Sequence, residues 1–148
     1  MTAIHVTRLI ARPLEEVFAV AQRVESFPDV LPDLDKVTIL ENDGVGNTVT
    51  KWEGTVSLGP LTRKIGWTER DHWDSAQKTC TFDLLSGDMK RFNGTWVFTD
   101  TGGGTQVDLQ VDFELGIPVL GPMINSMVDK LMTQNCDDLL TALERLSQ

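Results

Sequence analysis

The sequence predicts an α+β domain in which an antiparallel sheet is covered on one face by a long C-terminal helix. Three observations lead to this fold class. The middle of the chain is a run of alternating segments joined by short turns rich in glycine, aspartate and asparagine, which is typical of hairpins. From about Pro118 onward, apolar residues instead recur three and four positions apart, which is helical spacing. A shorter stretch with helical spacing lies near the N-terminus.

The N-terminal part begins with a strand and continues with two short helical segments. Residues 2–10 alternate as a strand does, and Pro13 with the two glutamates after it suits the first turn of a helix. The apolar stripe expected on this helix consists of Val17, Phe18, Val20, Ala21 and Val24. Pro28 and Pro32 then indicate a second short helical turn followed by a loop.

Six further strands are expected, which gives a sheet of about seven. Their predicted ranges are 36–43, 48–58, 63–73, 78–86, 90–99 and 106–115. In the last strand, polar residues alternate with Val107, Leu109, Val111 and Phe113. This alternation predicts a sheet with one covered face and one solvent-exposed face.

The C-terminal segment predicts a helix of up to about 30 residues, which would be about 45 Å long and could cross the whole sheet. One register of apolar residues consists of Leu120, Ile124, Met127 and Leu131. A second register consists of Val128, Leu139, Leu143 and Leu146. Because a straight helix fills only part of the concave side of a curved sheet, we expect a gap between the two.

Length and composition restrict the class of protein. The 148 residues suit a single domain, 1–148, without linker or repeat. The formal charge of −9 argues against nucleic acid and against anionic membrane surfaces as partners. The chain opens with no basic segment followed by an apolar run, and no stretch approaches about 18 uninterrupted apolar residues. We therefore expect no signal peptide, no stable membrane insertion and a cytoplasmic location.

Metal and covalent chemistry have little support in the sequence. The two histidines, His5 and His72, lie on separate predicted strands, so we expect no metal and no cofactor. Cys80 and Cys136 are far apart and outside any CxxC pattern, which predicts two buried reduced thiols. The glycine-rich stretch at 101–105 leads into a strand rather than a helix, so we interpret it as a hairpin turn and not a phosphate loop.

The element order and the residues that fill it resemble the START-like helix-grip superfamily, which includes the birch-pollen allergen fold. Within it, the chain is most similar to the polyketide cyclase/dehydrase and coenzyme Q-binding branch. The resemblance spans essentially all 148 residues. It is carried by IARPLEEVF at 10–18, VESFPDVLP at 24–32, WTER at 67–70, GDMKRFNGTWVF at 87–98 and FELGIP at 113–118. It implies a curved sheet around the C-terminal helix with a largely apolar cavity between them.

The aromatic content points to the residues that would line such a cavity. The chain has four tryptophans and six phenylalanines but no tyrosine, and strand parity turns many of these rings toward the helix. An ordinary packed core is the alternative for any one of them. The expected ligand-binding residues are Phe27, Leu31, Trp52, Ile65, Trp67, Phe82, Leu84, Trp96, Phe98, Leu109, Val111, Phe113, Met127, Val128 and Leu131.

Polar residues on inward faces distinguish a protein that only binds its ligand from an enzyme. Arg63 and Glu69 share the parity of the inward Trp67, and each would be costly to bury unpaired. We expect polar ends on this strand, where the sheet flares toward water, with a salt bridge at the rim as one possibility. If the two lie in the cavity instead, they are the candidate proton-handling pair. Asn135, on the helix stripe, is the candidate orienting group.

The sequence leaves three functions open. The sequence favours a protein that transports, sequesters or presents a hydrophobic small molecule such as a lipid, quinone or polyketide. The alternative is a polyketide cyclase or dehydratase acting in the same cavity. The resemblance implies arginine, tyrosine and asparagine groups for such a cyclase, and the absence of tyrosine removes a phenolic acid–base role. The third is a ribosome- or protein-interacting module. The ligand and the oligomeric state stay open.

Overall fold

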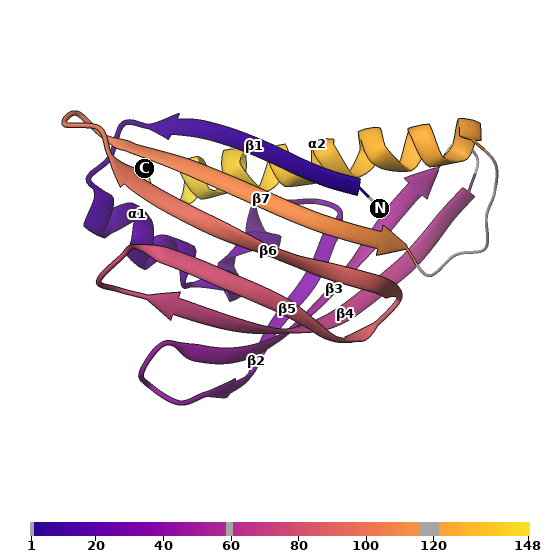
Figure 1. Cartoon of the computed structure of the whole chain (residues 1–148), viewed down its shortest axis with the longest axis horizontal. Coiled ribbons are helices and arrows are strands. Elements are labelled where there is room, and N and C mark those ends of the chain that lie inside the picture. The colour runs from indigo at the N-terminus through magenta and orange to yellow at the C-terminus, as the bar shows by residue number, and fades with distance from the viewer. Residues whose placement is uncertain (1, 59–60, 116–121) are drawn as a thin grey trace.

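In the computed structural model, a curved antiparallel sheet of seven strands is covered by the long helix α2, as the sequence predicts (Figure 1). The structure describes residues 2–58, 61–115 and 122–148. The elements are, in chain order, β1 (Thr2–Ile10), α1 (Leu14–Ala21), the 3₁₀ helix η1 (Val24–Asp29), β2 (Leu34–Asn42), β3 (Asn47–Leu58), β4 (Leu61–Asp74), β5 (Thr79–Gly87), β6 (Met89–Asp100), β7 (Thr105–Leu115) and α2 (Pro122–Leu146).

The sheet follows the chain almost without interruption. Its strand order is β1-β7-β6-β5-β4-β3-β2, and every neighbouring pair is antiparallel. Strands β2 to β7 therefore form consecutive hairpins, whereas β1 lies beside the last strand, β7 (Figure 1). This confirms the expectation of hairpins rather than parallel crossovers.

The two short helical segments after β1 are present, with one change in their boundary. Pro13 lies just before α1, and the helix ends at Ala21, so Val24 opens η1 instead of extending the first stripe. Phe18 of α1 packs edge-on against Trp73 and Phe98, with ring centroids 5.6 Å and 5.2 Å away. These T-shaped contacts join α1 to the inner side of the sheet.

Helix α2 buries the second of the two predicted registers. Within the described part of the helix, Val128 and Leu143 of this register are buried, and Leu139 and Leu146 are partly buried against the core. Met127 of the first register is 38% exposed, so its predicted inward position is wrong. Met127 lies outside the face of α2 that is buried, whereas its neighbour Val128 lies on that face. The expected start near Pro118 and the residue Leu120 lie outside the described residues.

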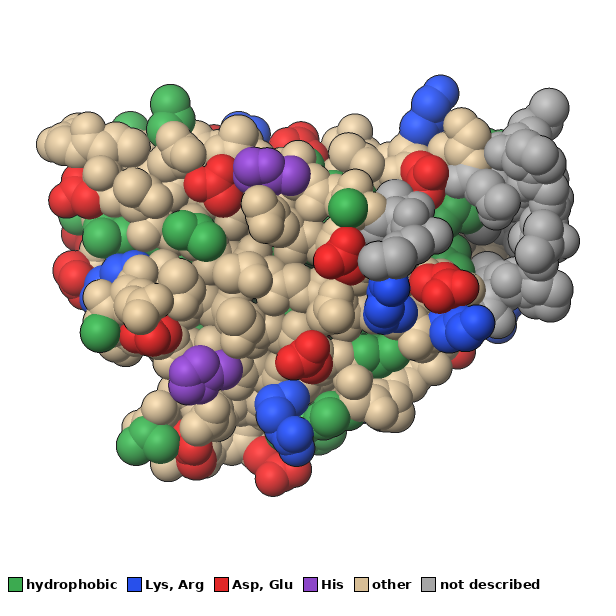
Figure 2. Space-filling view, viewed as in Figure 1, with side chains coloured by type: hydrophobic (Ala, Val, Ile, Leu, Met, Phe, Trp, Pro, Cys, Tyr) green, Lys and Arg blue, Asp and Glu red, His purple; other side chains and the backbone are tan. Residues whose placement is uncertain are grey.

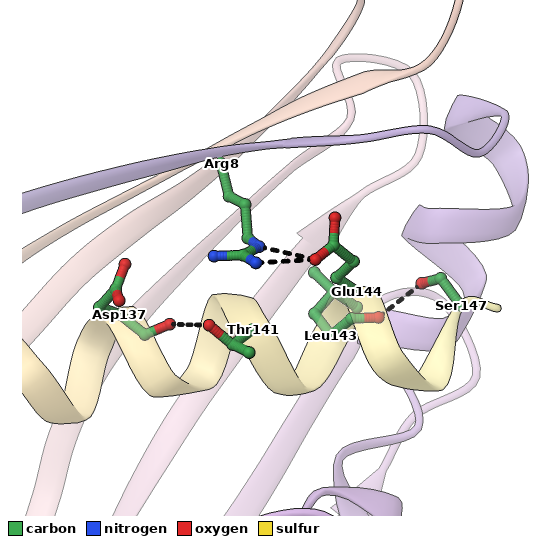
Figure 3. A network of polar contacts seen from close by, with 6 residues as sticks. All are labelled: Arg8, Asp137, Thr141, Leu143, Glu144 and Ser147. Carbon is green, nitrogen blue, oxygen red and sulfur yellow. Dashed lines mark hydrogen bonds and ion pairs between the residues drawn. The ribbon is translucent and has the colours of Figure 1, made fainter.

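The C-terminal half of α2 is also attached to the edge strand β1 by polar contacts (Figure 3). Arg8 of β1 points toward the helix, and its Nη2 and Nε donate to Oε1 of Glu144 at 2.8 Å and 3.0 Å. Thr141 and Ser147 donate to backbone carbonyls one turn earlier, those of Asp137 and Leu143. The Arg8–Glu144 pair thus links the end of α2 nearest the C-terminus to β1.

The outer face of the sheet is exposed to solvent, as the alternation predicts. Figure 2 shows acidic, basic and histidine side chains dispersed over this face, with single hydrophobic side chains between them. Cys80 and Cys136 lie inside the protein, buried and unpaired. None of the helices in the described ranges has the length and hydropathy that a membrane span requires.

Candidate functional site

A cavity of about 150 Å³ lies between the inner face of the sheet, the segment that joins η1 to β2, and α2. An apolar cavity of about this size is large enough for a benzene ring. Its lining is mainly aromatic and aliphatic, as in most small-molecule sites. The lining residues are Leu31, Pro32, Asp33, Leu34, Trp52, Gly54, Thr55, Val56, Ile65, Trp67, Met89, Phe92, Met132, Asn135, Cys136, Asp138 and Leu139.

Two tryptophans from adjacent strands form one wall of the cavity. Trp52 of β3 and Trp67 of β4 are directly opposite each other in the strand register. Their rings are stacked, with centroids 5.8 Å apart and planes only 5° from parallel. Phe92 of β6 continues the wall, 5.4 Å from Trp67 and tilted by 59°. The cross-strand register therefore creates a continuous aromatic surface facing α2.

A close backbone approach keeps this wall in place. Gly87, at the end of β5, has a φ of +132° and lies against the backbone of Trp67. A Cβ atom at this position would come within 2.5 Å of the Trp67 Cα. Only glycine meets both the conformational and the steric requirement here. The aromatic wall thus depends on a residue that does not itself line the cavity.

The indole N–H groups of both tryptophans bond to polar groups that do not line the cavity. Nε1 of Trp67 donates to Oε1 of Glu69 at 2.9 Å. Nε1 of Trp52 donates to Oγ1 of Thr50, also at 2.9 Å, and this hydroxyl donates to Asp71 at 2.7 Å. Because the polar edges are satisfied within the protein, the rings contribute only apolar surface to the cavity.

Glu69 and Asp71 form a buried pair of carboxyl groups. They are 5% and 6% exposed. Burial raises the pKa of Glu69 well above its ordinary value, and the hydrogen bond to Asp71 and the charge of that residue raise it further. The hydrogen bond from Trp67 acts in the opposite direction. Glu69 therefore keeps its proton to a higher pH than an ordinary glutamate does.

The expectation that β4 has polar ends in water is wrong at one end. Arg63 is exposed, but Glu69 and Asp71 are buried, because β4 stays paired with β3 and β5 on both sides and its inner face is covered as far as Trp73. Arg63 and Glu69 do not meet, so the structure does not assemble them as a proton-handling pair. Asn135 does line the cavity.

Four of the expected ligand-binding residues line the cavity: Leu31, Trp52, Ile65 and Trp67. Most of the others lie in the packed core, where the structure places Phe27, Phe82, Phe98, Leu109, Val111, Phe113 and Val128. Leu84, Trp96 and Leu131 are partly buried and do not line the cavity, and Met127 is exposed. These core residues pack against one another, whereas the cavity lies beside the segment that joins η1 to β2 and is closed by α2.

Several lining residues were missed by sequence reasoning. Met89 is turned inward by a β-bulge between it and Arg91, which reverses the parity that a regular strand would have. Asp33 and its neighbours lie in a segment without periodicity. Met132 and Cys136 lie close along the helix to the predicted Asn135. Phe92 had a usable signal, since it shares the parity of Trp96.

The chemistry available in the cavity is limited. Its titratable lining side chains are Asp33, Asp138 and Cys136, and burial raises the pKa of the Cys136 thiol to about 12. The thiol therefore stays protonated and unreactive near neutral pH. No lysine, arginine or histidine is among the lining residues in the described part of the chain. The described residues also contain no cluster of three or more His, Cys, Asp or Glu side chains suited to a metal ion.

Comparison with known proteins finds a matching family and similar solved structures. Residues 10–140 match the model of the family described as polyketide cyclase/dehydrase and lipid transport. The crystal structure of TTHA0849 from Thermus thermophilus is similar with a TM-score of 0.90 and 32% sequence identity, over 99% of this chain and 97% of that one. A search of curated proteins finds no match.

Two further solved structures share the fold at lower identity. The Zhui aromatase/cyclase from Streptomyces sp. R1128 has a TM-score of 0.84 and 23% identity, over 99% of this chain and 93% of its own. A START superfamily protein from Mycobacterium smegmatis has a TM-score of 0.74 and 22% identity, over 96% of this chain and 94% of its own. The helix-grip architecture is thus common to all three relatives.

Proposed function

The chain belongs to the polyketide cyclase/dehydrase and lipid transport family, and from this premise we propose that it binds a hydrophobic small molecule in the cavity between the sheet and α2. A lipid, a quinone or a polyketide fits this description. The protein would transport, sequester or present such a molecule. The observation that carries the proposal is the aromatic wall of Trp52 and Trp67, whose polar edges are satisfied by other residues of the protein.

Binding is expected on physical grounds because a ligand in the cavity would bury apolar surface. Removing apolar surface from water stabilises a complex by about 25 cal/mol for each Å². The cavity combines such surface with a single neutral amide, that of Asn135, which can donate to or accept from a ligand oxygen. Sites of this kind bind apolar molecules and orient them by a few polar groups.

Catalysis as a polyketide cyclase or dehydratase is the second candidate. The carboxyl pair of Glu69 and Asp71 favours it, because a pKa raised by burial is what a general acid needs. Neither residue lines the cavity, however, and Glu69 is bonded to the indole edge of Trp67. A reaction would require the carboxyl group to reach the substrate past this ring. Binding without turnover is therefore the function that we favour.

A blocking substitution tests the binding proposal. In Val56→Trp the larger side chain fills the cavity from β3, and we expect loss of binding of N-phenyl-1-naphthylamine, a neutral fluorescent probe. Val97→Trp is the matched control, because Val97 is 37% exposed and does not line the cavity. Equal probe binding by the two variants, or no binding by the unaltered protein, would contradict the proposal. Native mass spectrometry of the purified protein reports any ligand that is retained.

A further inference from the structure

We propose that Thr50, Glu69 and Asp71 are positioning residues, which hold the rings of Trp52 and Trp67 toward the ligand and so favour planar ring compounds over flexible chains. This inference rests on the proposed function, since it concerns the ligand that the same cavity selects. None of the three positioning residues lines the cavity. Each acts through a tryptophan or through another member of the network.

The hydrogen bonds fix the rotation of both rings. An indole has a single N–H donor, and each tryptophan uses it on a buried acceptor at 2.9 Å, Thr50 for Trp52 and Glu69 for Trp67. Asp71 lies beside both halves, because it accepts from Thr50 at 2.7 Å and is the neighbouring carboxyl group that acts on Glu69. A rotation of either ring about its side-chain bonds would break its only N–H bond. The nearly parallel stacking of the two indoles agrees with this restraint.

The burial of the network indicates that it does more than fill space. Thr50, Glu69 and Asp71 are 1%, 5% and 6% exposed. Burying carboxyl groups is unfavourable, and well-packed apolar side chains of similar volume are often at least as stabilising. A polar network is justified where its hydrogen bonds specify one arrangement of the groups it contacts. Here those groups are the two rings that line the cavity.

Ring orientation affects planar ligands more than flexible ones. A planar ligand gains from face or edge contact with indoles at a defined angle, in addition to the apolar area that it buries. An alkyl chain adapts to an irregular surface and gains mainly from buried area. Phe92, tilted against Trp67, closes a corner of the wall in which a flat ring can lie. Disorder of the indoles should therefore change the ratio of the affinity for a planar ligand to the affinity for a flexible chain.

The test uses two neutral alcohols with the same number of carbon atoms, 2-naphthalenemethanol and 1-undecanol, as competitors of the fluorescent probe. Thr50→Val keeps the side-chain shape but removes the hydroxyl that links Trp52 to Asp71. We expect it to weaken the naphthyl alcohol about tenfold relative to undecanol, which corresponds to one net hydrogen bond. Thr50→Ser restores the hydroxyl and should restore the ratio. Thr81→Val, at an exposed position of β5, should leave it unchanged.

A spectroscopic measurement separates positioning from general damage to the fold. Stacked indoles 5.8 Å apart couple electronically, so the pair should give a circular dichroism couplet that Thr50→Val reduces and Thr50→Ser recovers. If Thr50→Val does not fold, Glu69→Leu and Glu69→Gln form a second pair, because glutamine still accepts from Trp67 and leucine does not.

The binding and spectroscopic results together separate failure of this inference from failure of the proposed function. An unchanged ratio in a variant that has lost the couplet would overturn the inference, as would an equal loss for both alcohols, which indicates a purely structural role. If the unaltered protein binds neither alcohol nor the probe, the proposed function itself fails. A lower ratio together with a lost couplet, both recovered by Thr50→Ser, supports the inference.

Discussion

The buried carboxyl of Glu69 should make the stability of the protein depend on pH in a direction opposite to that of most carboxyl groups. Burial and the neighbouring Asp71 raise the pKa of Glu69 in the folded protein, whereas in the unfolded chain it returns to its ordinary value. Between these two values the folded protein holds one proton more than the unfolded chain. The contribution of Glu69 to stability is therefore fully present below the unfolded pKa and is lost as pH rises through the folded pKa.

The magnitude follows from that single proton. A difference of one bound proton changes the free energy of unfolding by about 1.4 kcal/mol for each pH unit, which is the largest slope that one group can give. In Glu69→Gln this slope disappears, while the amide oxygen still accepts from Trp67. We therefore expect the variant to gain stability relative to the unaltered protein as pH rises above the ordinary range of a glutamate.

Urea unfolding at a series of pH values between about 4 and 9 measures this difference. Other carboxyl groups, such as Asp108 with its lowered pKa, titrate in both proteins and cancel in the comparison. Glu41→Gln is the control, because Glu41 is exposed on β2 and should give a difference that does not vary with pH. A flat or falling difference for Glu69→Gln would refute the assignment of a raised pKa.

Three further predictions concern packing and reactivity. Leu140→Ala should cost about 2–5 kcal/mol of unfolding free energy in urea, because Leu140 is fully buried in the core, whereas the exposed Leu85→Ala should change it by less than about 0.5 kcal/mol. Gly87→Ala should cost about 1–3 kcal/mol and shift the tryptophan fluorescence, while Gly103→Ala, with open space around it, should shift neither. Cys136, with a pKa of about 12, should resist alkylation at about pH 8 in the folded protein and react after unfolding, and rapid labelling of folded protein would contradict its burial.

The architecture was predictable because its signals are local. Alternation and turn residues predicted the strands, and helical spacing predicted α2 without reference to distant contacts. The residue types at 10–18 and 87–98 added the resemblance to a known fold family. Element boundaries were less accurate, as Val24 illustrates: it continues the apolar spacing of α1 but belongs to η1. Helix ends depend on capping and tertiary contacts that spacing alone does not show.

The cavity was less predictable because it depends on where packing is incomplete. Parity correctly turned Trp52 and Trp67 inward, but it could not tell which inward residues face empty space and which face α2. The bulge before Arg91 reversed the direction of Met89. The carboxyl pair was underestimated for another reason. A charged residue on an inward face suggests a strand end, and the sequence alone does not show that burial raises the pKa of Glu69.

A crystal structure of the protein with a brominated planar ring compound, such as 2-bromonaphthalene, would show directly whether the cavity binds such a ligand. The anomalous signal of bromine locates the ligand independently of the protein phases. We expect a peak inside the cavity, against Trp67 and Phe92 and within reach of α2. A peak confined to the surface would contradict this expectation. So would an empty cavity in crystals of protein that binds the compound in solution.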